Sequence, residues 1–157
     1  INSVDQRLGR LSKELSLLEQ EFSILDNEQS NIFWNRTKNL EVFKSLKSNL
    51  LRIVLPMSET LQVIQKLKNF EIKYFIDWGG GLIWASFDQL NTKILSEIKD
   101  TVKKHQGYIT LIKVEEDLKA SADIFTIDPI KYKISEKIKR SFDPKRIFNP
   151  GKMYTGI

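Results

Sequence analysis

The chain contains no cysteine, so disulfide bonds and thiolate-bound metal sites are excluded. With a single histidine, a transition-metal site would need mostly carboxylates, and no acidic cluster has suitable spacing. No apolar run approaches the ~20 residues of a membrane-spanning helix. Neither a P-loop nor a Gly-x-Gly-x-x-Gly motif occurs. We therefore expect no metal site, no transmembrane segment and no conventional catalytic residue. His105, beside Lys103 and Lys104, is expected to be exposed.

The 157 residues are enough for one domain with a real core, and 41% of them are hydrophobic. Because the first residue is Ile and not Met, we expect a fragment of a longer protein or a processed chain. The formal net charge is +5, and residues 131–152, with eight Lys or Arg and two acidic residues, account for all of it. Such a basic end can dock nucleic acid or an acidic partner, or it can be a solvated helix face.

A glycine turn between two β-prone runs organises the chain. Residues 72–77 and 82–86 are mostly apolar, and three consecutive glycines at 79–81 lie between them. Glycine readily adopts the positive φ values of a tight reversal, so the pattern predicts a β-hairpin. A strand and a helix are predicted before the hairpin, and a helix and a strand after it: 50–55, 59–69, a helix starting at Asp88 or Asn91, and 108–114. This β-α-β-β-α-β order predicts an α+β, ferredoxin-like fold with an antiparallel four-stranded sheet covered by helices.

The ends and inner faces of these helices follow from capping residues and periodicity. Ser58 is the expected cap of helix 59–69, and Gly107 the expected stop of the next helix. The side chains expected to face the core from helix 59–69 are Leu61, Ile64 and Leu67.

Extra helices are predicted at both ends. Residues 3–25 carry one apolar stripe, which most simply faces a core and alternatively faces a partner helix or a membrane surface; its members are Val4, Leu8, Leu11, Leu15, Leu18, Phe22 and Leu25. A second helix, about 28–39, follows a cap at Asp26 or Asn27. Near the other end, Asp128-Pro129 opens a helix and Asp143-Pro144 closes it.

Three residues near the hairpin are candidates for ligand contact. Arg52 lies inside an otherwise apolar strand, so it is either in a structural ion pair or at a ligand. Trp78, next to the turn, can cap a core or form a ligand wall. Asp77 can contribute to the same site or simply accept hydrogen bonds from turn amides.

The tail holds a second candidate. Asn149-Pro150-Gly151-Lys152 suits a type II turn, with Pro150 and Gly151 at its central positions. Such a turn brings backbone amides, one amide side chain and one cation together. It can bind a carboxylate, a phosphate or a polar ring edge, or it can be only a C-terminal clasp.

With these residues the chain resembles a known family. Phe142-Asp143-Pro144 followed by Asn149-Pro150-Gly151-Lys152 is similar to the ending of the FAD-linked oxidases of the vanillyl-alcohol oxidase superfamily. Together with Phe33-Trp34, Leu51-Arg52-Ile53 and the Asp77-Trp78-Gly79-Gly80 hairpin, in this order, it resembles the C-terminal half of an FAD-binding glycolate oxidase subunit of bacteria.

The resemblance implies that residues 1–157 are a single cap domain that covers a flavin held mainly by an N-terminal FAD-binding domain absent from this chain. It implies Asn149, Gly151 and Lys152 as FAD-side residues, with Arg52, Asp77, Trp78 and Tyr108 on the side of a small 2-hydroxy acid. The implied partners are that domain, a homologous flavin subunit and an iron–sulfur subunit, with a cytoplasmic location or one peripheral at the inner membrane. The fragment is not expected to oxidise glycolate alone.

Two other functions fit the sequence. A non-enzymatic ferredoxin-like module could bind nucleic acid through the basic end, although the aromatic residues near Trp78 and Trp84 lie away from the lysines, so no nucleic acid is expected. A scaffold subunit related to the oxidases, without a working flavin site, is the other alternative.

Overall fold

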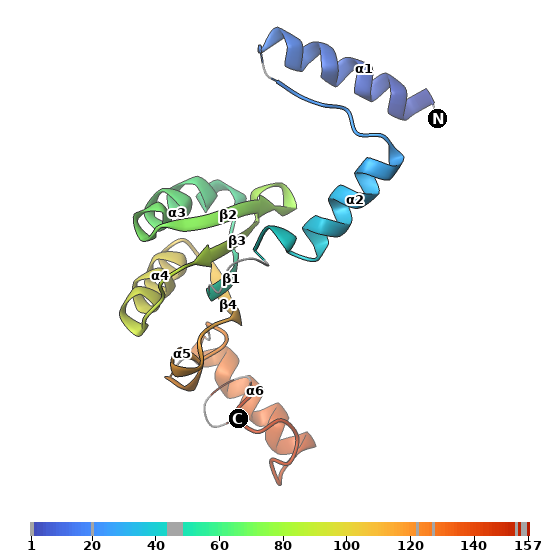
Figure 1. Ribbon diagram of the computed structural model, residues 1–157. Helices are drawn as coiled ribbons and strands as arrows, with labels where there is room; N and C mark the ends of the chain where they lie inside the picture. The colour runs from blue at the N-terminus through green and yellow to red at the C-terminus, as the bar shows by residue number, and fades with distance from the viewer. Residues whose placement is uncertain are drawn as a thin grey trace. The chain divides into compact units, whose positions relative to one another are not determined.

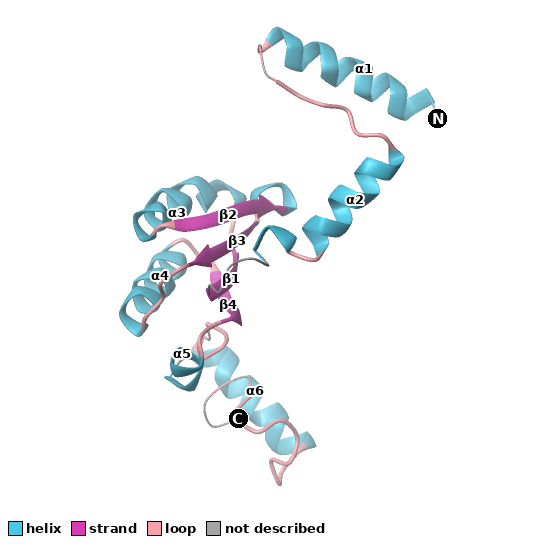
Figure 2. Cartoon of the chain, in the orientation of Figure 1, coloured by secondary structure: helices cyan, strands magenta, loops and turns pink. Residues whose placement is uncertain are grey.

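The computed structural model describes residues 2–19, 21–43, 49–121, 123–126, 128–152, 154 and 157. The chain divides into two compact units, Ile1–Val42 and Phe43–Ile157, which are considered separately (Figures 1 and 2). Across the described ranges, no helix combines the length and the apolar character that crossing a membrane requires.

The first unit contains α1 (Asn2–Leu17) and α2 (Asn27–Lys38). The expectation of one helix to residue 25 is wrong, because α1 ends at Leu17 and residues 21–26 have no regular structure. Asp26 caps α2 and forms a capping box with Gln29, as one of the two predicted caps. None of the described side chains of this unit is buried within it, so the apolar stripe of α1 is not a core face there.

The second unit carries the predicted order of elements. Its strands and helices are β1 (Asn49–Val54), α3 (Thr60–Leu67), β2 (Ile72–Asp77), β3 (Leu82–Phe87), α4 (Thr92–Lys104), β4 (Tyr108–Lys113), α5 (Glu116–Ser121) and α6 (Pro129–Phe142). The sheet is antiparallel throughout, in the order β2-β3-β1-β4. The α+β, ferredoxin-like prediction is confirmed. Helix α5 was not predicted.

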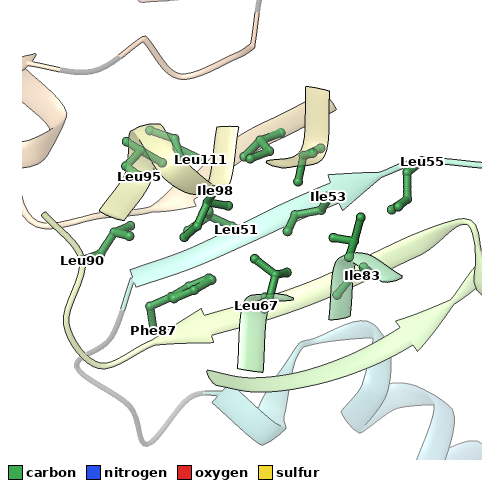
Figure 3. Close-up of a cluster of buried hydrophobic side chains, with 14 of the residues drawn as sticks. Leu51, Ile53, Leu55, Leu67, Ile83, Phe87, Leu90, Leu95, Ile98 and Leu111 are labelled. Carbon is green, nitrogen blue, oxygen red and sulfur yellow. The ribbon is translucent and has the colours of Figure 1, made fainter. Parts of the chain in front are cut away.

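One face of the sheet packs against α3 and α4 to form the core (Figure 3). Leu51, Ile53, Ile83 and Phe87 from the strands are each fully buried. The helices contribute the remaining layer, with Val63, Ile64, Leu67, Leu95, Ile98 and Val102. Alternation in the strands and three- to four-residue steps in the helices place these side chains together.

Three helix details differ from the sequence prediction. Ser58 lies in a 3-10 turn, Met57–Glu59, and α3 begins without a side-chain cap. Leu61 is 71% exposed, because α3 begins at Thr60 and turns Val63 inward in its place. Gln106, not Gly107, takes the positive φ after α4. Gly107 is required instead for space, since a Cβ there would lie 2.7 Å from Val102 Cγ1.

A short segment extends the sheet beyond β4. Phe125 pairs with Thr110 in an antiparallel bridge, the Leu111 amide donates to Ile124 O, and the Thr126 amide donates to Ile109 O. The short run Ile124-Phe125-Thr126 is therefore a segment at the edge of the sheet. Asp128 then caps α6 by accepting hydrogen bonds from the amides of Ile130 and Lys131, as predicted. Ile127, between them, lies outside the described residues.

Candidate functional site

The face of the sheet opposite α3 and α4, called the second face here, carries a transverse row of five side chains. The strand register aligns Phe75, Trp84, Arg52 and Thr110 across β2, β3, β1 and β4, and Phe125 continues the row beyond Thr110. Residues paired across antiparallel strands project from the same face. All five are partly exposed, so this row is accessible in part.

Aromatic contacts continue the row at both ends. Phe43, the first residue of the second unit, stacks on Phe75 with ring centres 5.6 Å apart. At the other end the ring of Tyr154 lies 5.9 Å from that of Phe125 and 6.2 Å from that of Tyr132. The tail is thus anchored beside the second face through Tyr154.

Arg52 lies at the centre of the row, and its guanidinium carbon lies 4.9 Å from the centre of the Trp78 indole. Among the described residues no carboxylate forms an ion pair with Arg52, so the structural ion pair considered from the sequence is not found there. A guanidinium stacked on an aromatic ring keeps donors at its edge, in the planar fork that suits a carboxylate.

The hairpin turn holds Trp78 in place. The Asp77 carboxylate accepts a hydrogen bond from the Trp78 amide at 2.7 Å, the capping role that the sequence allowed for it. Trp78 itself has φ +53°, a left-handed conformation that is costly for a bulky residue, and Gly79 and Gly80 also have positive φ. The Thr60 hydroxyl donates to Gly80 O and fixes the turn to the start of α3. The indole stays 58% exposed.

Tyr108 lies on the same face as Arg52, because it pairs with Val54, two residues along β1. It is 45% exposed and is the first residue of β4. Asp77 shares this next row through Leu82, which pairs with both Asp77 and Val54. The four substrate-side candidates from the sequence therefore lie on one face or at the turn that borders it.

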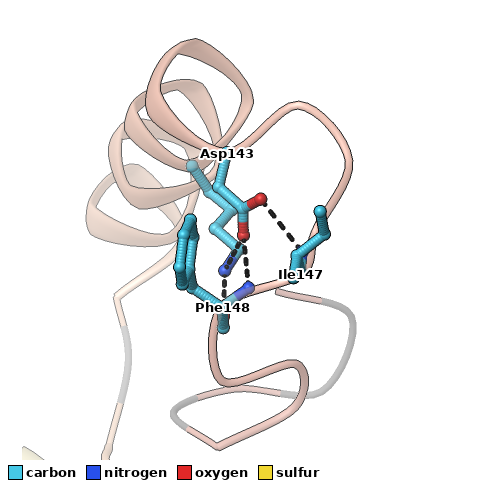
Figure 4. Close-up of polar contacts among 4 residues, drawn as sticks. Asp143, Ile147 and Phe148 are labelled. Carbon is cyan, nitrogen blue, oxygen red and sulfur yellow. Dashed lines mark hydrogen bonds and ion pairs between the residues drawn. The ribbon is translucent and has the colours of Figure 1, made fainter.

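The tail is folded by Asp143 (Figure 4). Its carboxylate accepts hydrogen bonds from the amides of Ile147 and Phe148, both at 2.9 Å, and pairs with Lys139 Nζ at 2.8 Å. Lys139 also donates to Phe148 O. The Lys139 hydrogen bond, supported by the two amides, lowers the pKa of Asp143 to about 2. Asp143 therefore closes the loop after α6 as well as ending the helix.

The turn at residues 149–152 forms as predicted. Gly151 has φ +68°, and the Lys152 amide donates to Asn149 O at 3.2 Å. The Gly151 amide donates to Ile157 O, so two amides expected to be free for a ligand are used within the tail. The side chains of Asn149 and Lys152 are exposed, and no atom lies within 4 Å of where a Cβ of Gly151 would stand. A flat group can approach this turn closely.

The two candidate groups are not joined directly. None of the hydrogen bonds, ion pairs or ring contacts of the described residues links Asn149 or Lys152 to Arg52, Trp78 or Tyr108. The connection runs through Tyr154, which packs on Phe125 at the end of the row. The sequence prediction missed this aromatic anchor, because Tyr154 and Phe125 are 29 residues apart and carry no shared motif.

A polar cluster contradicts the expectation for His105. The imidazole is buried, its Nδ1 lies 2.6 Å from Glu59 Oε2, and its Nε2 lies 3.0 Å from Lys66 Nζ. The expected exposure is wrong because α3 packs against α4, and Glu59 and Lys66, at the two ends of α3, contact the ring. His105 is 39 residues from Lys66 and 46 from Glu59, so no motif signals the cluster. Across the described ranges, no group of three His, Asp or Glu residues could hold a metal ion.

Comparison with known proteins gives one match. Residues 125–153 match the family model of the C-terminal domain of FAD linked oxidases. No curated protein and no solved structure matches the chain. The matched segment begins at Phe125 and includes α6, the Asp143 loop and the turn at 149–152. It supports the predicted relation to the FAD-linked oxidase superfamily, and it does not distinguish a glycolate oxidase within it.

Proposed function

We propose that this chain is the substrate-side cap domain of an FAD-linked oxidase that acts on a small 2-hydroxy acid, with glycolate, oxidised to glyoxylate, as the first candidate. The observation that carries the proposal is the position of Arg52, an arginine stacked on an exposed indole and paired with no carboxylate of the described residues. The match of the tail to the C-terminal domain of FAD linked oxidases supports the flavin part.

In this proposal Arg52 binds the substrate carboxylate through its fork of N–H groups. Trp78 and Tyr108 exclude water from one side of the bound acid and limit its size. When bound, FAD would accept a hydride, which is two electrons and one proton, from the hydroxyl-bearing carbon, and the hydroxyl proton would pass to a base or to water outside the described residues. This division of work needs no acid or base from the described part of this chain.

The residues present fit only the edge of a flavin. Two amides of the 149–152 turn are used internally, but the Asn149 amide side chain, the Lys152 ammonium and the open space at Gly151 remain. These groups would meet a polar ring edge. The chain offers no glycine-rich loop for the diphosphate, so a separate N-terminal domain would hold FAD, and a homologous flavin subunit and an iron–sulfur subunit would complete the enzyme.

Coexpression of this chain with the N-terminal FAD-binding domain that the proposal assigns to the same protein tests the proposal. We expect FAD to copurify with the complex and glycolate to reduce a dye. Arg52→Lys should lower kcat/KM about tenfold or more at unchanged FAD content, because lysine cannot bind a carboxylate in bidentate fashion. Arg10→Lys, at a side chain 83% exposed on α1, is the control. An assembled complex without FAD would favour the scaffold alternative.

Nucleic-acid binding is the weaker candidate. The cations of residues 131–152 lie among exposed isoleucines and the exposed Phe142 and Phe148, and a nucleic acid would leave the isoleucines unmatched. The family match of residues 125–153 supports an oxidase instead. Filter binding with steep salt dependence would revive this alternative.

A further inference from the structure

Helix α6 exposes its apolar side chains, the reverse of what a helix in a globular domain usually does. Ile130, Ile134 and Ile138 are 69%, 53% and 55% exposed, and no residue of α6 is buried. Their four-residue spacing places them along one outward stripe. Phe142, four residues further on, is 85% exposed. An apolar stripe normally faces the core, so this one is available to something outside the described residues.

The polar side of α6 is the side that faces the tail after it. Tyr132 packs on Tyr154, Glu136 pairs with Arg140 and lies 3.9 Å from Arg146, and Lys139 pairs with Asp143. Glu136, the one acidic residue of this helix, is thus already neutralised on the inner side. The polar face of α6 is therefore in contact with the tail, and its apolar face points outward.

Cations border the outward stripe. At 100° per residue, Lys131 lies about 60° to one side of Ile134, and Lys137 lies about 60° to the other, with Lys133 beyond it. All three lysines are exposed. The outward surface of α6 therefore combines large aliphatic side chains, flanking ammonium groups and no carboxylate. Long lysine side chains can place their charges at a polar boundary while their stems stay in an apolar layer.

We propose that the outward face of α6 binds the surface of an anionic lipid bilayer, with the helix lying in the plane of the membrane interface. Such a surface offers negative headgroups directly above an apolar layer, which matches a stripe of isoleucine bordered by lysine. An acidic protein surface or nucleic acid would pair with the lysines and leave the isoleucines unmatched. This site is separate from the second face, and the proposal does not depend on flavin binding.

Flotation of the 157-residue chain with vesicles tests the proposal. We expect binding to an equal mixture of phosphatidylcholine and phosphatidylglycerol and no binding to phosphatidylcholine alone. Raising salt from about 0.1 M to about 1 M, which shortens the Debye length from about 10 Å to about 3 Å, should weaken it. Absence of binding to the anionic vesicles at low salt would overturn the proposal.

Two double variants test the helix itself. Ile134→Ser with Ile138→Ser should weaken binding at least about tenfold, since two aliphatic anchors are lost. Lys131→Gln with Lys137→Gln should weaken it about fivefold per lysine. Leu61→Ser, at a leucine 71% exposed on α3, and Lys103→Gln with Lys104→Gln, on exposed residues of α4, are the matched controls. Circular dichroism should show unchanged helix content in all of them.

Three outcomes contradict the membrane proposal. Equal losses in the α6 variants and the controls would show nonspecific adsorption. A chain that dimerises without lipid, and that the serine variant makes monomeric, would assign the stripe to a second copy. A complex with the FAD-binding domain that no longer binds vesicles would assign it to that domain.

Discussion

The guanidinium of Arg52 lies against the indole of Trp78, with 4.9 Å between the guanidinium carbon and the ring centre. Arg52 comes from the middle of β1, whereas Trp78 is held in a left-handed conformation by the β2–β3 turn. The contact therefore joins the centre of the second face to a tryptophan with positive φ at its border.

This contact should be measurable as a coupling energy. In a double-mutant cycle of Arg52→Gln and Trp78→Leu, we expect about 0.5–2 kcal/mol of coupling, the range for partly desolvated cation–π pairs. Urea unfolding of the four proteins gives the value. Strict additivity of the two substitutions would show that the contact contributes nothing to the stability of the folded chain.

Gly107→Ala should destabilise the second unit strongly. The added methyl group would lie 2.7 Å from Val102 Cγ1 and 2.9 Å from both Leu55 Cβ and Val54 O. The core must therefore shift, which should lower the free energy of unfolding by about 1–3 kcal/mol. Gly9→Ala is the matched control, because a Cβ at Gly9, inside α1, meets nothing within 4 Å. There alanine should favour the helix by about 0.5–1 kcal/mol. Equal responses of the two variants in urea unfolding would contradict this difference.

Asp143 should make the tail sensitive to acid. Its pKa in the folded chain is about 2, below the ~3.9 of an unfolded aspartate. The ionised carboxylate therefore stabilises the loop fully above about pH 4, and this stability is lost as the pH falls through about 2. NMR titration of the Asp143 carboxyl and of the Ile147 and Phe148 amides checks it. Asp143→Asn should remove the dependence in this window, whereas Asp117→Asn, at an exposed residue of α5, should keep it.

The His105 cluster should fix one tautomer. A carboxylate can only accept a hydrogen bond, so the contact with Glu59 requires a proton on Nδ1. Lys66 donates to the other nitrogen, which must then be unprotonated. In the neutral ring, nitrogen NMR should therefore find the proton on Nδ1. Glu59→Gln should shift the tautomer balance, and Lys68→Gln, an exposed lysine on the neighbouring turn, should leave it unchanged. A proton on Nε2 would contradict the arrangement.

The sheet was predictable because its signals are local. Three glycines mark the reversal between β2 and β3, and a mostly apolar, β-prone run lies on each side of them. The burial of His105 was not predictable, because it depends on how α3 packs against α4. Gly107 was predicted as the helix stop, but Gln106 takes the positive φ, and only the packed structure reveals that a methyl group at Gly107 would clash.

The candidate site was predictable in part. An arginine within an apolar strand and a tryptophan beside a glycine turn are visible in the sequence, and the structure brings Arg52 and Trp78 into contact. The role of Phe125 as the end of the row was not visible, because a single bridge residue leaves no period. The outward direction of Ile130, Ile134 and Ile138 could not be read either, since periodicity defines a stripe and not what it faces.

The segment around Phe125 also protects the sheet from aggregation through its β4 edge. By bonding to Ile109 and Leu111 it occupies hydrogen-bonding groups along the outer side of β4, where a foreign strand would otherwise add. On the opposite margin, β2 carries the charged side chain of Lys73, a residue type that discourages such addition. Removing residues 123–126 should therefore expose a template for fibrillar growth at one margin only.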